Sequence, residues 1–117
     1  MALTIRNIII DSGDAAKAAD FWAAATGWSV EPWSHSGEAA VAAPGGDLRL
    51  YFMRVPEQKT VKNRVHLDLE PDVPAAAEIE RLTGLGATKV RAYDSYTVLT
   101  DPEGNEFCVM NGTGESA

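Results

Sequence analysis

The chain has 117 residues, a formal charge of −7 and a sequence pI near 4.7. This length suits one domain with a single core, and the negative charge repels nucleic-acid phosphates while attracting cationic small molecules. The sequence contains no run of about 18 apolar residues, and residues 1–6 lack the features of a signal peptide. We therefore expect a cytoplasmic protein with neither nucleic-acid nor membrane partners. Its one cysteine, Cys108, excludes an internal disulfide.

The sequence contains two similar halves. Asn7 lies in a strand-like segment followed by a helical pattern, and His66 lies in a second such segment 59 positions later. Each half then continues into further strand-like sequence with a glycine-containing turn. Such a repeat builds paired modules whose concave faces form a pocket. We place the modules at residues 1–57 and 62–111, separated by a polar linker, with a flexible tail at 112–117.

The first module reads as a strand, a helix and further strands. Residues 3–11 are rich in isoleucine and predict a buried strand. Asp14 is a suitable N-cap for the helix that follows. Residues 15–25 carry apolar side chains at spacings of three and four and are followed by Gly27, which is typical of a helix and its end. Further strands are predicted at residues 29–31, 38–41 and 48–53.

The second module opens with a strict alternation over residues 64–69. As a strand, this segment places Val65, Leu67 and Leu69 on one face and the polar Arg64, His66 and Asp68 on the other. A helix follows, for which Asp72 is the expected N-cap and Gly84 and Gly86 mark the end. Strands are predicted at residues 88–92, 96–100 and 106–110, with a turn at 101–105.

Several segments together resemble a known family. They are residues 7–14, 21–22, 26–28, 62–69, 85–87 and 100–107. In order and spacing they are similar to the glyoxalase-like branch of the vicinal oxygen chelate superfamily, which includes glyoxalase I, extradiol dioxygenases and bleomycin resistance proteins. The resemblance extends to Met110. It implies an α+β fold of two βαβββ modules whose curved mixed sheets form a cup, either within one chain or across a dimer.

The resemblance also implies a position for a metal. Enzymes of the superfamily hold a divalent cation with four side chains, usually His, Gln or Glu, from the first and last strands of each module. The corresponding positions here are Asn7 and His66 on the first strands, and Cys108 with either Leu50 or Met53 on the last. Only His66 is a conventional ligand. We therefore expect no metal and no other cofactor.

One alternative for a metal stays open. His66, Asp68 and Cys108 offer nitrogen, oxygen and sulfur, all of which suit zinc. Glu106 lies on the same strand face as Cys108 and could replace it as a ligand. Without a metal, His66 and Asp68 are candidate acid and base groups, or His66 is simply hydrogen-bonded across the sheet. Cys108 is interpreted as a small core residue, because no basic neighbour in sequence would activate it as a nucleophile.

Aromatic residues provide the remaining candidates. Rings on strands or at strand ends can stack on a flat ligand or simply pack within the protein. The expected ligand-binding residues are Asn7, Trp33, Tyr51, Met53, His66, Tyr93, Tyr96, Glu106 and Cys108, and the expected catalytic residues are His66 and Asp68.

Two functions follow from these residues. The first is a metal-free protein that binds a small aromatic or cationic molecule in the cup between the modules, as drug-sequestering members of the superfamily do. The second is an enzyme, a lyase, isomerase or dioxygenase-like protein with a degenerate metal site or with acid and base chemistry at His66 and Asp68. A structural or regulatory dimer without a dedicated ligand is a third possibility. We expect a homodimer, as is common in the superfamily.

Overall fold

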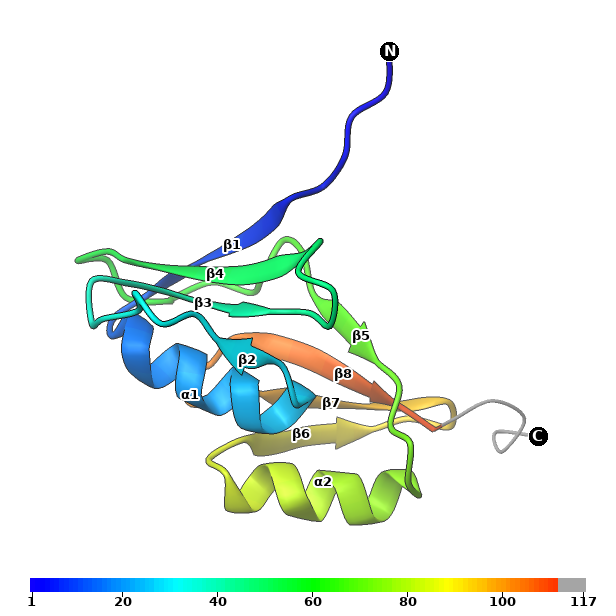
Figure 1. The fold of residues 1–117 in the computed structure, drawn as a ribbon. Coiled ribbons are helices and arrows are strands. Elements are labelled where there is room, and N and C mark those ends of the chain that lie inside the picture. The colour runs from blue at the N-terminus through cyan, green and yellow to red at the C-terminus, as the bar shows by residue number, and fades with distance from the viewer. Residues whose placement is uncertain (112–117) are drawn as a thin grey trace. The chain divides into compact units, whose positions relative to one another are not determined.

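The structure is a computed structural model that describes residues 1–111. The tail predicted at 112–117 lies outside these residues. The chain divides into two compact units, Met1–Gln58 and Lys59–Ala117, here called the first and second units (Figure 1). Within residues 1–111, no helix combines the length and the apolar character that a membrane crossing requires.

The first unit is a βαβββ module. Its elements are β1 (Asn7–Ser12), α1 (Ala15–Thr26), β2 (Ser29–Val30), β3 (Glu38–Ala42) and β4 (Arg49–Arg54). The strands form one sheet in the order β1-β4-β3-β2, in which β1 and β4 are parallel and the other pairs are antiparallel. The sheet is therefore mixed, and its parallel pair joins the first and last strands of the module.

Helix α1 has the boundaries expected from its sequence. The Asp14 side chain accepts a hydrogen bond from the Lys17 backbone N–H at 3.2 Å, which confirms the predicted N-cap. Gly27 ends the helix with a φ of 78°, a left-handed conformation that glycine adopts without strain. The helix buries Phe21 and Trp22, whose rings meet edge to face with centroids 5.2 Å apart. These two rings are part of the buried core of the first unit.

Alternation along β4 divides the first sheet into two faces. Helix α1 covers one face of the sheet (Figure 1), and Leu50 and Phe52 are buried. Arg49, Tyr51 and Met53 therefore point to the opposite face, here called the open face of the first unit. The ligand-binding candidates on the strands of this unit, which are Asn7, Tyr51 and Met53, all lie on that face.

The second unit repeats the topology of the first. Its elements are β5 (Leu67–Leu69), α2 (Ala75–Gly84), β6 (Thr88–Ala92), β7 (Tyr96–Thr100) and β8 (Glu106–Met110). The sheet order is β5-β8-β7-β6, again with a parallel pair between the first and last strands. The two matching units confirm the repeat and the expected α+β class.

The second sheet also has one covered and one open face. Phe107, Val109 and Leu99 are buried, together with Leu82 of α2. Glu106, Cys108 and Met110 alternate with them and point to the open face, beside Tyr96 and Val98 of β7. The turn before β8 is built as predicted: the Asp101 carboxylate accepts hydrogen bonds from the N–H groups of Glu103 and Asn105, each at 2.9 Å.

The predicted N-cap of the second helix was wrong. The helix begins after Pro74, and no side chain caps it. A residue that precedes proline is kept out of the helical region by the proline ring, so the helix cannot begin at Val73. Asp72 is therefore too far upstream to act as the cap.

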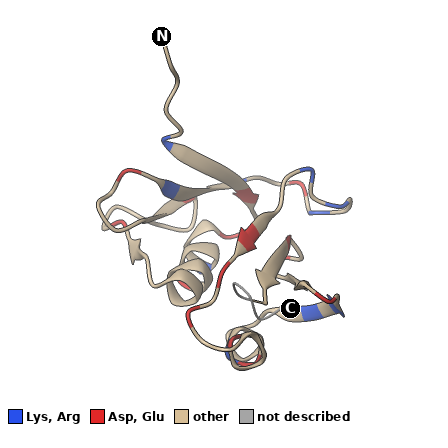
Figure 2. Ribbon diagram, turned by 90° about the vertical axis from the view of Figure 1, so that its right-hand side faces the viewer, with Lys and Arg blue, Asp and Glu red and all other residues tan. Residues whose placement is uncertain are grey.

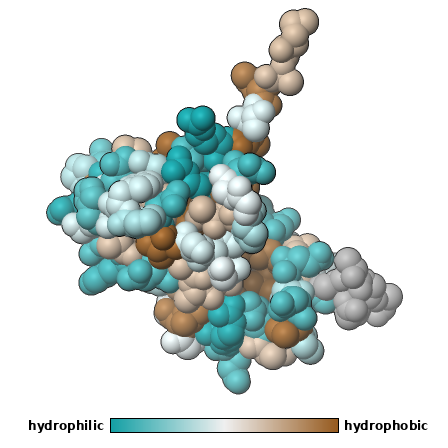
Figure 3. Space-filling view, viewed as in Figure 1, coloured by the Kyte–Doolittle hydropathy of each residue, from teal (hydrophilic) through white to brown (hydrophobic). Residues whose placement is uncertain are grey.

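Two strands begin several residues later than predicted, β1 at Asn7 and β5 at Leu67. Residues 3–6 precede β1, and Leu3 and Ile5 are exposed there on an extended segment (Figure 3). β4 begins at Arg49, opposite Asn7, so its ladder does not extend to this segment. Likewise, β5 begins only at Leu67, because Glu106 of β8 uses its backbone carbonyl to accept a hydrogen bond from the Asn63 side chain at 3.2 Å.

The two helix starts predict different responses to mutation. Asp14→Ala removes a real N-cap and should lower the free energy of unfolding by about 1 kcal/mol. Asp72→Ala, the matched control, removes the same carboxylate two residues before the actual helix cap and should change it by less than about 0.5 kcal/mol. Urea denaturation followed by circular dichroism measures both. Equal losses in the two variants would contradict the assignment of the caps.

Candidate functional site

The open face of the second unit carries a group of three potential ligands, here called the triad: His66, Asp68 and Cys108. The ligand atoms of the triad all lie within 4.8 Å of one another. His66 Nε2 is 3.4 Å from Asp68 Oδ1. The parallel register places Asp68 directly opposite Cys108 on the neighbouring strand. His66 lies one residue before β5. It stays close to Asp68 although β5 is shorter than predicted.

The members of the triad differ in exposure. The side chains of His66 and Asp68 are 44% and 58% exposed, whereas Cys108 is buried. Burial, together with the charge of Asp68 and a hydrogen bond to it, raises the pKa of the Cys108 thiol above its ordinary value, against an opposing effect of Lys62. Without a bound cation, Cys108 is thus a neutral thiol near pH 7 rather than an activated nucleophile.

Glu106 lies on the same face but has other partners. Its carboxylate pairs with Lys59 Nζ at 3.2 Å and accepts a hydrogen bond from the Asn63 N–H at 3.0 Å. Partial burial acts to raise the pKa of Glu106, but the Asn63 hydrogen bond and the Lys59 charge outweigh it, so the pKa is lowered overall. These contacts hold the segment before β5 against β8. Sequence reasoning missed Lys59 and Asn63, which lie in or beside the linker.

The open face of the first unit is a connected polar network. Arg49 Nε donates a hydrogen bond to Asn7 Oδ1 at 3.0 Å, and Arg49 Nη1 lies 3.2 Å from Glu31 Oε2. The Tyr51 hydroxyl donates a hydrogen bond to Glu38. This hydrogen bond, with the negative charge of Glu38, raises the pKa of Tyr51, so Tyr51 is a neutral donor at neutral pH.

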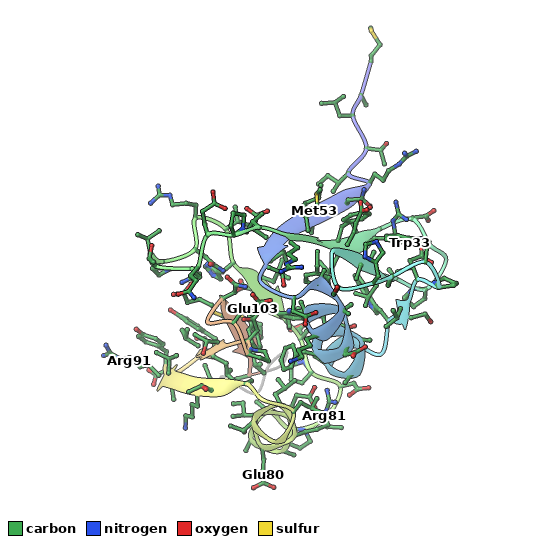
Figure 4. The ribbon with its side chains drawn as sticks, turned by 90° about the vertical axis from the view of Figure 1, so that its left-hand side faces the viewer. Trp33, Met53, Glu80, Arg81, Arg91 and Glu103 are labelled. Atoms are coloured by element: carbon green, nitrogen blue, oxygen red, sulfur yellow. The ribbon has the colours of Figure 1, made fainter. Side chains whose placement is uncertain are left out.

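Each unit also carries a pair of aromatic rings beside an arginine. In the first unit, the rings of Trp33 and Tyr51 have centroids 5.4 Å apart, and Arg49 Cζ lies 5.6 Å from the Tyr51 ring. Figure 4 shows Trp33 and, on β4, Met53. The spacing of arginine and tyrosine at alternate positions of one strand is a signal that could have identified Arg49 from sequence.

The second unit repeats this arrangement with different residues. Tyr93 and Tyr96 are stacked, with centroids 4.9 Å apart and an interplanar angle of 24°. Arg91, labelled in Figure 4, has its Cζ 4.8 Å from the centroid of Tyr93. The structure therefore brings Tyr93 and Tyr96 together as a pair, and it adds an arginine that sequence reasoning did not select.

The topology and the repeated βαβββ unit define a glyoxalase-type fold. The family model described as "Glyoxalase-like domain" matches residues 7–110, and the chain belongs to this family. The resemblance inferred from the sequence is thus confirmed. No curated protein matches the chain.

Solved structures with the same fold are distant in sequence. A glyoxalase/bleomycin resistance protein/dioxygenase family enzyme from Burkholderia phytofirmans PsJN is 17% identical, with a TM-score of 0.75 over 92% of this chain and 97% of that one. A possible glyoxalase from Bacillus cereus is 17% identical, with a TM-score of 0.70 over 93% and 99% of the two chains. An E126Q mutant of the fosfomycin resistance protein FosX from Listeria monocytogenes, complexed with Mn(II) and a dihydroxypropylphosphonic acid, is 18% identical, with a TM-score of 0.71 over 99% and 95%.

The residues at the family's four metal positions do not suit a shared metal centre. In the first unit, the amide oxygen of Asn7 already accepts a hydrogen bond from Arg49. The alternatives on β4 are Leu50, a buried hydrocarbon, and Met53, a thioether. Neither is a ligand for the hard divalent cations that carboxylates and imidazoles bind. Within residues 1–111, one group of at least three His, Cys, Asp or Glu side chains comes close enough together to bind a metal, and it is the triad. All three members of the triad belong to the second unit.

The contacts of Glu106 predict a pH-dependent contribution to stability. Glu106→Gln should lower the free energy of unfolding by about 1–2 kcal/mol at pH 7, since it removes a charge-assisted hydrogen bond and an ion pair. The folded state lowers the pKa of Glu106, so this contribution is present above the pKa of the unfolded state and is lost as pH falls through the lower pKa of the folded state.

Urea titrations of wild type and Glu106→Gln between neutral and acidic pH measure this difference. Glu70→Gln, which changes an exposed carboxylate of the same unit, is the matched control and should have little effect at any pH. A difference between wild type and Glu106→Gln that stays constant down to the acid limit would contradict the assigned role of Glu106.

Proposed function

We propose that this glyoxalase-like protein binds a small aromatic or cationic molecule, as drug-sequestering members of the superfamily do, without the family's four-ligand metal. One observation carries the proposal: each unit has an aromatic pair beside an arginine, Trp33–Tyr51 with Arg49 and Tyr93–Tyr96 with Arg91. The faces of aromatic rings offer a flat apolar surface to a planar ligand.

Partial exposure of these rings supports ligand contact. Trp33 is 43% exposed and Tyr93 is 42% exposed. Each ring nevertheless has a packing partner that restrains its orientation, so little conformational freedom is lost when a ligand stacks on it. Apolar side chains near the first pair extend the surface: Ile9 lies opposite Tyr51 in the strand register, and Met53 follows two residues later. Both are exposed.

Charge favours a cationic ligand. The formal charge is −7, and Figure 2 shows acidic residues in both units. Glu38 lies beside Tyr51, and the Asp68 side chain is 58% exposed on the second open face. These carboxylates attract a cationic group, and because Arg49 and Arg91 already lie over the Tyr51 and Tyr93 rings, that group would bind beside the carboxylates rather than over those two ring faces.

Binding without a shared metal agrees with the side chains at the family positions. Asn7 is held by Arg49, and neither Leu50 nor Met53 supplies an imidazole or carboxylate. The fosfomycin resistance protein from Listeria monocytogenes has the same fold, so the fold accommodates resistance to a small drug. The homodimer expected from the sequence stays a prediction, which the molecular mass in solution tests.

A screen of aromatic amines and other planar cations by tryptophan fluorescence tests this function. Exposed Trp33 is the expected reporter, and ligands should be recovered unchanged. Trp33→Leu, which keeps an apolar side chain but removes the ring, or Tyr93→Ala should weaken binding about tenfold, or about 1.4 kcal/mol. Trp28→Phe is the control for the loss of an indole away from the pair.

Binding should survive chelation of divalent metals. A screen that finds no ligand, or equal affinity in all variants, would overturn the proposal.

A second candidate function is catalysis by His66 and Asp68. The 3.4 Å distance between His66 Nε2 and Asp68 Oδ1, with both side chains exposed, favours it. A carboxylate that orients an imidazole helps it to exchange protons with a substrate. The reaction class would be that of a glyoxalase-like lyase or isomerase that moves a proton next to a carbonyl.

Turnover distinguishes the enzyme from the binding protein. If a ligand found in the screen is converted, His66→Gln and Asp68→Asn should each lower kcat at least about 100-fold while the affinity for the ligand changes little. His35→Gln, which alters the other histidine, should leave kcat unchanged. Conversion that persists in both triad variants would exclude acid and base roles for these residues.

A further inference from the structure

We propose that the triad of His66, Asp68 and Cys108 binds Zn²⁺ or a similar borderline cation within the second unit. This site differs from the family's centre, because it takes no ligand from the first unit and includes Asp68, which lies outside the four family positions. His66 and Cys108 do occupy two of those positions. The inference does not rest on the proposed small-molecule function.

The geometry of the triad is close to that of a zinc site. Zinc binds thiolate sulfur at about 2.3 Å and imidazole nitrogen or carboxylate oxygen at about 2.0–2.2 Å, which places neighbouring ligand atoms about 3.3–3.7 Å apart in a tetrahedron. His66 Nε2 and Asp68 Oδ1 are already separated by 3.4 Å. The largest separation within the triad is no more than 4.8 Å, so a shift of about 1 Å brings all three into tetrahedral range.

The structure explains which side chains would move. Cys108 is buried in the centre of β8, where ladders to β5 and β7 fix its backbone on both sides. Asp68 stands directly opposite, on the edge strand β5. Both Asp68 and His66 have exposed side chains that can change rotamer at little cost. The thiol is the fixed ligand, and the other two adjust around it.

The donor set selects among cations. Sulfur and imidazole ligands favour zinc and cobalt, whereas magnesium and calcium require a shell of oxygen atoms. On binding, a Zn–S bond replaces the S–H bond of Cys108, and the proton leaves to solvent, so no oxidant or reductant is needed. The triad supplies three ligands, and the exposure of His66 and Asp68 leaves room for water at the fourth position.

Metal content and cobalt absorption test the site on the full chain. Protein stripped with a chelator and dialysed against Zn²⁺ should retain one equivalent, and Mg²⁺ should not compete. Co²⁺ should give a thiolate-to-metal charge-transfer band in the near ultraviolet, together with release of a proton. Cys108→Ser should abolish the band, and each of Cys108→Ser, Asp68→Asn and His66→Gln should weaken Zn²⁺ binding at least about 100-fold.

Controls separate ligand loss from unfolding. Asp68→Asn and His66→Gln change exposed side chains, so they test the site even if Cys108→Ser disturbs the core. His35→Gln and Asp72→Asn change a histidine and an aspartate outside the triad and should retain full binding. No retention of Zn²⁺ by wild type, or undiminished retention in the triad variants, would overturn the inference. Neither result bears on ligand stacking at Tyr93 and Trp33, which is measured in chelated protein.

Discussion

Parallel pairing between the first and last strands of each module is the constraint on which the rest of the structure depends. β1 pairs with β4, and β5 pairs with β8. Parallel neighbours need a long connection between them, and in each unit a helix and two strands supply it. The helix covers one face of the sheet, so alternate residues of the last strand are buried against it. Their neighbours, Tyr51 and Cys108 among them, are directed to the open face.

Local signals explain why much of the fold could be predicted from the sequence. The carboxylate of Asp14 and the conformational freedom of Gly27 act within one or two helical turns, so they set the ends of α1 wherever the helix packs. The Asp101 turn is equally local, since its side chain binds N–H groups only two and four residues away. The prediction that Asp72 caps α2 was wrong because Pro74 keeps the preceding residue, Val73, out of the helical conformation. This restriction outweighs the preference for an acidic N-cap.

The site depends on contacts between distant residues, which sequence patterns do not reveal. Alternation correctly placed His66 and Asp68 on one face, and the family resemblance put Cys108 among the candidates. Neither could show that Arg49, 42 positions from Asn7, would donate a hydrogen bond to the Asn7 amide oxygen, which we expected to contact a ligand. Nor could either show that Glu106 would bind Asn63, 43 positions away, and thereby leave the triad without a further carboxylate. Such pairings depend on strand register, and a shift of one residue exchanges the two faces.

The two open faces share a topology but differ in how their polar groups are satisfied. In the first unit, Arg49 joins Asn7 to Glu31, and Tyr51 binds Glu38, so the charged and amide groups are paired with one another. In the second unit, His66 and Asp68 pair with each other and Asp68 interacts with the Cys108 thiol, but the side chains of both His66 and Asp68 are exposed to solvent. A ligand can bind such exposed groups by replacing water. Stacking can therefore occur on either unit, whereas polar chemistry is favoured on the second.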